Sequence, residues 1–217
     1  MFVGHYAAAF ALKGTEKRAS LGLLFLATQW VDILYFPFVL LGWEDLTFVD
    51  HFTAVNNFKM EFPYTHGLVA SCGWGLLTFL AYWFFAGKNK SLKVGLVLAL
   101  AVISHWFTHV LVHTPDLPLV TGNPKFGLGL WHSKVLTFAV EAIFLLAGWG
   151  YYYMKTVSQR KGGKFLSLWF VGLLLLVNYL NLYVLPSENN IWSLTISALA
   201  AYVVFALMAF RVDKYRA

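Results

Sequence analysis

Long apolar runs, separated by short polar segments, dominate the pattern of this 217-residue chain. A helix needs about 20 apolar residues to cross the hydrocarbon core of a bilayer. Six stretches meet that requirement, at residues 19–42, 65–86, 91–113, 133–154, 165–185 and 191–210. They are expected to be helices because a membrane-spanning backbone must satisfy its own polar groups. Pro37 predicts a kink near the end of the first stretch.

A further apolar segment, residues 2–12, is too short to span and predicts a half-length or interfacial helix. Its basic residues follow it rather than precede it, so we do not expect a signal peptide. The expected fold class is all-α: a polytopic transmembrane helix bundle of six spans plus a short N-terminal half-helix. We expect one domain over residues 1–217, with the candidate chemistry in residues 1–154 and two packing helices in residues 165–210.

Composition strengthens the membrane assignment. Hydrophobic residues make up 59% of the chain and charged residues 12%, against about 25% charged in soluble domains. The single cysteine, Cys72, excludes an intramolecular disulfide and a cysteine-rich zinc site. The net charge of +6 belongs, in a membrane protein, to cytoplasmic loops and does not indicate nucleic-acid binding.

Basic residues cluster in alternate connections, at positions 13–18, 88–93, 155–164 and 211–216. The opposite connections are mostly acidic. The positive-inside rule therefore places the basic connections in the cytoplasm and predicts that both termini are cytoplasmic.

The strongest candidate for chemistry is the sequence SHWFTHVLVHTPD, residues 104–116. His105, His109 and His113 recur every four residues, which puts them on one helix face with a drift of about 40° per step. Neutral imidazole is a good ligand for zinc, iron or copper, and two histidines at this spacing hold one metal in zinc proteases. The alternative is a polar face that lines water or bonds to neighbouring helices. We favour a metal because such groups are costly to bury in a membrane without a partner.

Other ionisable side chains fall at compatible depths. Asp32 lies about 20 Å from the start of the first span. A carboxylate is costly to bury at that depth, so we expect it to bind a metal or another cation. The alternative is a hydrogen-bonded or protonated Asp32 that serves helix packing. His5 reaches about 12 Å into the bilayer if the N-terminal helix rises from Lys13. His66 lies at the outer end of the second span, and it is a candidate metal ligand only because the other ionisable side chains are expected nearby.

The fourth span adds His132 at its start and Glu141 nine residues deeper. Glu141 could orient a ligand histidine or act as a general base. It could also pair with Lys134 in a structural ion pair.

Taken in order, these motifs resemble those of the bacterial membrane-bound metal-dependent hydrolases. That family looks distantly related to the zinc-dependent phospholipase C and single-strand nuclease superfamily. More closely, the chain looks like a set of bacterial integral membrane proteins with patterns similar to GHxAxxxxxK, QxxDxxxP, PYSHxL, SHWxxDxxxHxPDxPL and GLGLWNS. The matching residues are Gly4 and His5, Gln29 and Asp32, 63–68, 104–119 and 127–133, so the resemblance covers residues 1 to about 150.

The resemblance implies a bacterial inner membrane and a metal held by His5, Asp32, His66, His105 and position 109, with further candidates at His113, Asp116 and His132. The chain departs from the pattern twice: His109 replaces the usual Asp, and His132 replaces the usual Asn. A carboxylate can bridge two metals, whereas an imidazole normally binds one. We therefore expect a single divalent ion, Zn²⁺, rather than the superfamily's multinuclear cluster.

The expected function is a membrane-embedded zinc hydrolase that acts on a lipid-like or hydrophobic ester or phosphodiester through a metal-activated water. Asp32 or Glu141 would take the proton, and the partner is a membrane lipid or hydrophobic small molecule. Two alternatives stay open. One is a redox enzyme, including a haem protein with His66 and His109 as axial ligands. The other is a metal or proton transporter or a metal-stabilised scaffold, and transport predicts ligands staggered through the bundle.

Overall fold

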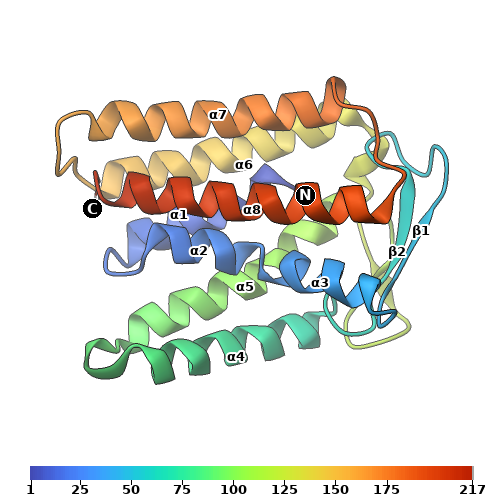
Figure 1. Ribbon diagram of the computed structural model, residues 1–217, viewed down its shortest axis with the longest axis horizontal. Helices are drawn as coiled ribbons and strands as arrows, with labels where there is room; N and C mark the ends of the chain where they lie inside the picture. Colours follow the sequence, from blue (N-terminus) through green and yellow to red (C-terminus); the bar gives the residue numbers. More distant parts are fainter. Residues whose placement is uncertain (217) are drawn as a thin grey trace.

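The apolar stretches fold as helices that run side by side in the computed structural model, which describes residues 1–216 (Figure 1). Five helices are long and apolar enough to cross a membrane: α4 (Leu68–Phe85), α5 (Leu92–Val112), α6 (Lys134–Lys155), α7 (Gly163–Tyr183) and α8 (Ile191–Asp213). The bent pair α2 (Leu21–Thr28) and α3 (Trp30–Leu40) makes a sixth span when counted as one. The prediction of an all-α integral membrane protein is confirmed.

The first span is broken at Gln29, whereas the sequence placed its kink at Pro37. The axes of α2 and α3 are bent by 47°, and Pro37 lies inside α3. At the break the Gln29 N–H donates to the Leu26 carbonyl, only three residues back. The neighbouring Thr28 carbonyl accepts a hydrogen bond of 2.8 Å from Nδ1 of His105. The break therefore supplies a backbone acceptor to the histidine cluster.

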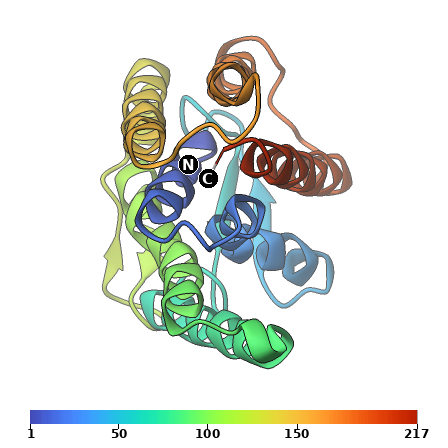
Figure 2. The ribbon, with the colours of Figure 1, turned by 90° about the vertical axis from the view of Figure 1, so that its left-hand side faces the viewer.

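The N-terminal segment, η1 (Val3–His5) followed by α1 (Tyr6–Thr15), lies inside the bundle against α2, α5 and α6 (Figure 2). Tyr6 and Phe10 are fully buried, which excludes the interfacial position that the sequence left open. Lys13 is also buried and pairs with Asp213 of α8 at 2.7 Å. Because the segment runs inward from Lys13, Met1 is buried between the two ends of the bundle, and not at the end where the sequence placed it.

The two ends of the bundle differ in character. The loops 86–91 and 156–162 lie at the end that also holds the C-terminus, here called the basic end (Figure 1). The opposite end, here called the hairpin end, carries two antiparallel strand pairs. They are β1 (Asp45–Phe48) with β2 (Phe58–Glu61), and β3 (Leu117–Pro118) with β4 (Lys125–Phe126). The sequence was interpreted as having only loops here. Short 3-10 turns complete the chain at η2 (Gly87–Asn89) and η3 (Leu130–His132).

An aromatic core fixes the position of α1 and therefore of the residues that precede it. Tyr6 stacks on Phe25 of α2 with ring centroids 4.2 Å apart, and Phe10 packs edge-on against the same ring at 5.3 Å. Phe170 of α7 closes the cluster at 5.4 Å from Phe25. Burying large rings of this kind stabilises each contact beyond its area alone. His5 is held at the inner end of this packed helix.

Candidate metal centre

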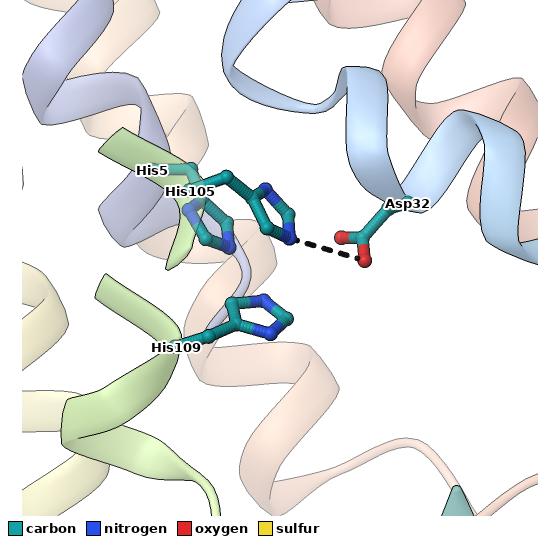
Figure 3. Close-up of side chains that lie close together, drawn as sticks. All are labelled: His5, Asp32, His105 and His109. Atoms are coloured by element: carbon teal, nitrogen blue, oxygen red, sulfur yellow. Dashed lines mark ion pairs between the residues drawn. The ribbon is translucent and has the colours of Figure 1, made fainter. Parts of the chain in front are cut away.

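Four side chains from three segments converge inside the bundle (Figure 3). His105 and His109 lie in the second half of α5, the half farther from the basic end. One donor atom from each of His5, Asp32, His105 and His109 lies within 4.8 Å of all the others. His5 ends η1, Asp32 lies in the first turn of α3 after the break, and the other two share one face of α5. This group could hold a metal ion, as the sequence predicted for these four residues.

Hydrogen bonding assigns the proton on His105. Its Nδ1 lies 2.8 Å from the Thr28 carbonyl oxygen, which can only accept. Nδ1 therefore carries the ring proton, and a neutral ring must then present a lone pair at Nε2. That atom lies 3.4 Å from Oδ1 of Asp32. In the neutral ring, two electron-pair donors therefore face each other across this distance, as two ligands of one metal ion would.

His5 is held in the same way. Its Nδ1 lies 2.7 Å from the hydroxyl oxygen of Thr108. That hydroxyl has helix carbonyls as its own acceptors, Ser104 at 3.2 Å and His105 at 2.9 Å. The oxygen of Thr108 therefore accepts from Nδ1–H of His5, and Nε2 of His5 keeps a lone pair. Nε2 is buried and finds no hydrogen-bond partner within residues 1–216.

His109 completes the group without any polar contact of its own. Both ring nitrogens are buried, and neither has a hydrogen-bond partner in the part of the chain that the structure describes. Its ring packs between those of His105, 4.1 Å away, and His113, 4.5 Å away. A buried polar atom left unpaired costs about 1–3 kcal/mol. Three imidazoles with buried nitrogens that find no hydrogen-bond partner within residues 1–216, close to one carboxylate, fit a metal cation.

His66 joins the group through Asp32, with Nε2 at 3.1 Å from Oδ1. It precedes α4, and its Nδ1 lies 2.7 Å from the hydroxyl of Thr65. Burial lowers the pKa of His66 to about 4, although the hydrogen bond to Asp32 opposes the shift. The ring is therefore neutral near pH 7 and can act as a metal ligand.

The buried carboxylate of Glu44, in the loop between α3 and β1, contacts Thr65, which in turn contacts His66. Glu44 accepts hydrogen bonds from the backbone N–H groups of Tyr64 and Thr65, and its two oxygens lie 2.9 and 2.8 Å from the Thr65 hydroxyl. Burial raises the pKa of Glu44, against the effect of these hydrogen bonds. The Thr65 hydroxyl therefore links Glu44 to Nδ1 of His66 and holds the ring with Nε2 directed at Asp32.

Two of the further candidates form a separate pair beside the group. Nδ1 of His113 lies 2.9 Å from Oδ1 of Asp116, while Nε2 of His113 is buried without a partner among residues 1–216. Asp116 thus orients His113 as a carboxylate behind a ligand would. His132 differs from both, because it is exposed in η3 and the structure leaves it outside the histidine cluster.

The Glu141 carboxylate bonds to backbone N–H groups rather than to a side chain. Its carboxylate accepts hydrogen bonds from the N–H groups of Phe2, at 3.1 Å, and Gly4, at 3.0 Å. Lys134 is exposed, and within the described residues it forms no ion pair with Glu141, so that sequence alternative is not realised. The contacts fix the turn that carries His5. This geometry favours an orienting role, and a catalytic role for Glu141 stays a prediction.

The sequence interpretation missed a contact from the last span. The hydroxyl of Tyr202, in α8, donates to Oδ2 of Asp32 at 3.2 Å. The residue range 165–210 was expected to do no more than pack. Tyr202 leaves Oδ1 of Asp32 to face the imidazoles. A phenol inside an apolar helix gives no sequence signal for such a contact, since tyrosine is also an ordinary packing residue.

A cavity of about 560 Å³ reaches the group from one side. Asp32, His109 and Tyr202 form part of its wall, together with side chains of α7, α8 and β2, whereas His5 and His105 do not line it. Asp32 keeps 9% of its surface exposed. Water and a substrate would therefore meet the group on the face formed by Asp32 and His109.

No protein-family model matches this chain, and neither the curated proteins nor the solved structures give a match. The resemblance to membrane-bound metal-dependent hydrolases accordingly rests on the sequence motifs, which include His5, Asp32 and His105 of the four residues that converge here.

Proposed function

We propose that this chain is a membrane-embedded zinc hydrolase that acts on a lipid-like or hydrophobic ester or phosphodiester. The observation that carries the proposal is that donor atoms of three imidazoles and of the Asp32 carboxylate lie within 4.8 Å of one another at the wall of a cavity. The motifs shared with the membrane-bound metal-dependent hydrolases support it independently. His5, Asp32, His105 and His109 would hold the ion, with His66 beside Asp32.

Zinc suits this donor set. Histidine nitrogen and carboxylate oxygen are common zinc ligands, and Cys72 is exposed, away from the buried group. When bound, zinc supplies a Lewis acid and activates water for hydrolysis at neutral pH. On the protein side, Asp32 places a carboxylate on the cavity wall, where it can take a proton, and Tyr202 fixes its orientation.

The compactness of the group supports hydrolysis over the alternatives. A transporter would space its ligands along a path, whereas these four donors lie within 4.8 Å. A haem held by His66 and His109 would place its macrocycle between the two rings. Their centroids are only 5.0 Å apart, and both rings also pack against His105. This packing leaves no slot for a porphyrin.

We also assign the membrane and the orientation. The positive-inside rule puts the basic end in the cytoplasm, and the resemblance points to a bacterial inner membrane. His105 and His109, in the second half of α5, then lie in the half of that helix farther from the cytoplasm.

The direct test is metal-dependent hydrolysis by the full chain in lipid nanodiscs. We expect hydrolysis of p-nitrophenyl dodecanoate or of bis(p-nitrophenyl) phosphate, its loss on treatment with a chelator, and its recovery when zinc is added back. Hydrolysis that survives complete metal removal would contradict the proposal, as would a zinc-loaded protein that is inactive towards both substrates.

Thr65→Val tests the support behind His66. The substitution keeps the shape but removes the hydroxyl that links Glu44 to the ring, so we expect zinc affinity to fall by about 10–100-fold. Competition against a chromophoric zinc chelator measures this change. Thr78→Val is the matched control, since the Thr78 hydroxyl bonds only to the Trp74 carbonyl within α4. Equal zinc affinities for the two variants would show that Thr65 does not position His66.

A further inference from the structure

The wall of the cavity beside the metal group is largely apolar. Phe36 of α3, Phe58 and Met60 of β2, and Leu194 and Ala198 of α8 all contribute to it, as does Leu185 between α7 and α8. The volume of about 560 Å³ falls within the 300–1,000 Å³ usual for small-molecule sites. A cavity of this size and composition fits one apolar chain, and Asp32 and His109 are the residues of the metal group that line it.

The charges on the wall restrict the polar part of the ligand. Over residues 1–216 no lysine or arginine side chain lines the cavity, and its two charged side chains, Asp32 and Glu188, are both acidic; Met1, which carries the α-amino group, also lines it. A divalent ion at the group would be balanced by these two carboxylates. Phosphate groups are normally bound by arginine or lysine, and an unpaired charge is costly to bury. The wall therefore favours an uncharged polar group over a phosphodiester.

We infer that the substrate is an uncharged, single-chain carboxylic ester whose apolar chain occupies the cavity between α7 and α8 while its ester group lies at Asp32 and His109. This inference rests on the proposed hydrolase function and narrows it. It also gives the last two helices a function: α8 presents the small side chains of Ala198 and Ala201 to the cavity and leaves room there for the chain.

The reaction that follows is ester hydrolysis. The oxygen of one water forms a bond to the acyl carbon, and the bond from that carbon to the alcohol oxygen breaks. One water proton ends on the alcohol, and the other stays with the carboxylic acid, which releases it near neutral pH. No oxidant, reductant or further reactant is needed.

Filling the cavity tests the inference without requiring catalysis. The probe is a dodecyl glycerol ether with a photoreactive diazirine in its chain, which cannot be hydrolysed, added to the full chain in nanodiscs. We expect its label on residues 177–202 and expect Ala198→Trp to reduce that labelling by about tenfold, because the indole takes the space of the chain. Ala200→Trp is the matched control, since Ala200 is exposed on α8 and does not line the cavity.

Competition and kinetics supply the remaining readouts. Unlabelled dodecyl glycerol ether should compete at least about tenfold better than dodecyl phosphate, because only the phosphate brings a negative charge to the acidic wall. Ala198→Trp should raise KM for p-nitrophenyl dodecanoate, whereas the control Ala200→Trp should leave that KM at the wild-type value. Undiminished labelling in Ala198→Trp, or equal competition by dodecyl phosphate, overturns the inference.

The outcomes separate this inference from the function on which it rests. If the label appears on the expected residues but the zinc-loaded chain hydrolyses no ester, the hydrolase function is rejected. The cavity is then still supported as a binding site for an uncharged single-chain ligand. Zinc-dependent hydrolysis with labelling spread evenly over the lipid-facing helices would keep the hydrolase and reject the cavity as the chain-binding site.

Discussion

Replacing His105 with alanine is expected to remove most of the metal from the purified protein. His105 is fully buried at the centre of the cluster, with its ring 4.2 Å from that of His5 and 4.1 Å from that of His109. The Thr28 carbonyl already fixes its orientation, so the alanine variant has no substitute nitrogen at that place. Losing a residue that merely orients a ligand costs 10–100-fold in metal affinity, so losing a ligand should cost about 100-fold or more.

Elemental analysis of zinc per chain measures this effect, and the chain provides its own control. His132→Ala removes a histidine that is exposed and outside the cluster, so it should retain the zinc content of the wild type. The assignment of His105 as a ligand would be wrong if both variants lost zinc equally, or if the His105→Ala protein kept it.

Asp32→Asn is expected to abolish hydrolysis and to make the stability of the protein independent of zinc. The amide keeps the shape of the carboxylate, but its NH₂ group can donate to Nε2 of His66 or His105, which face Oδ1 in the wild type. The substitution therefore removes the charge that attracts the metal and gives the imidazoles a proton donor. We expect the metal-free variant to exceed the metal-free wild type in unfolding free energy by about 1 kcal/mol or more.

Thermal unfolding with zinc and with a chelator tests this prediction. The wild type should gain about 2.7 kcal/mol when free zinc is at 100 times Kd, and Asp32→Asn should gain nothing. Asp50→Asn, at an exposed position near the hairpin end, should behave as the wild type. An Asp32→Asn protein that still gains stability from zinc, or is less stable than the wild type without metal, would contradict the role given to Asp32.

The part of the site that was predictable from the sequence follows from helix geometry. The four-residue spacing of His105 and His109 determines that they share a face, whatever the helix packs against. His5 needed one more condition, that the N-terminal helix runs inward from Lys13, and the structure meets it.

Tertiary contacts decide the remainder, and local patterns do not report them. No proline or glycine next to Gln29 predicts the break there. The Thr28 carbonyl at the break accepts a hydrogen bond from His105, which is 77 positions away along the chain. Glu44 lies in a loop where a carboxylate is ordinarily exposed, yet it is buried against Thr65. The strand pairs at the hairpin end are only two to four residues long, too short for an alternation of polar and apolar positions to be recognised.

The central claim, one zinc ion held by imidazole nitrogens and a carboxylate, is tested most directly by X-ray absorption at the zinc edge on the purified wild-type chain. The expected spectrum shows zinc bound only by nitrogen and oxygen at about 2.0–2.2 Å, with the scattering pattern of several imidazole rings. A chain that carries no zinc, or a zinc shell dominated by sulfur at about 2.3 Å, would contradict it.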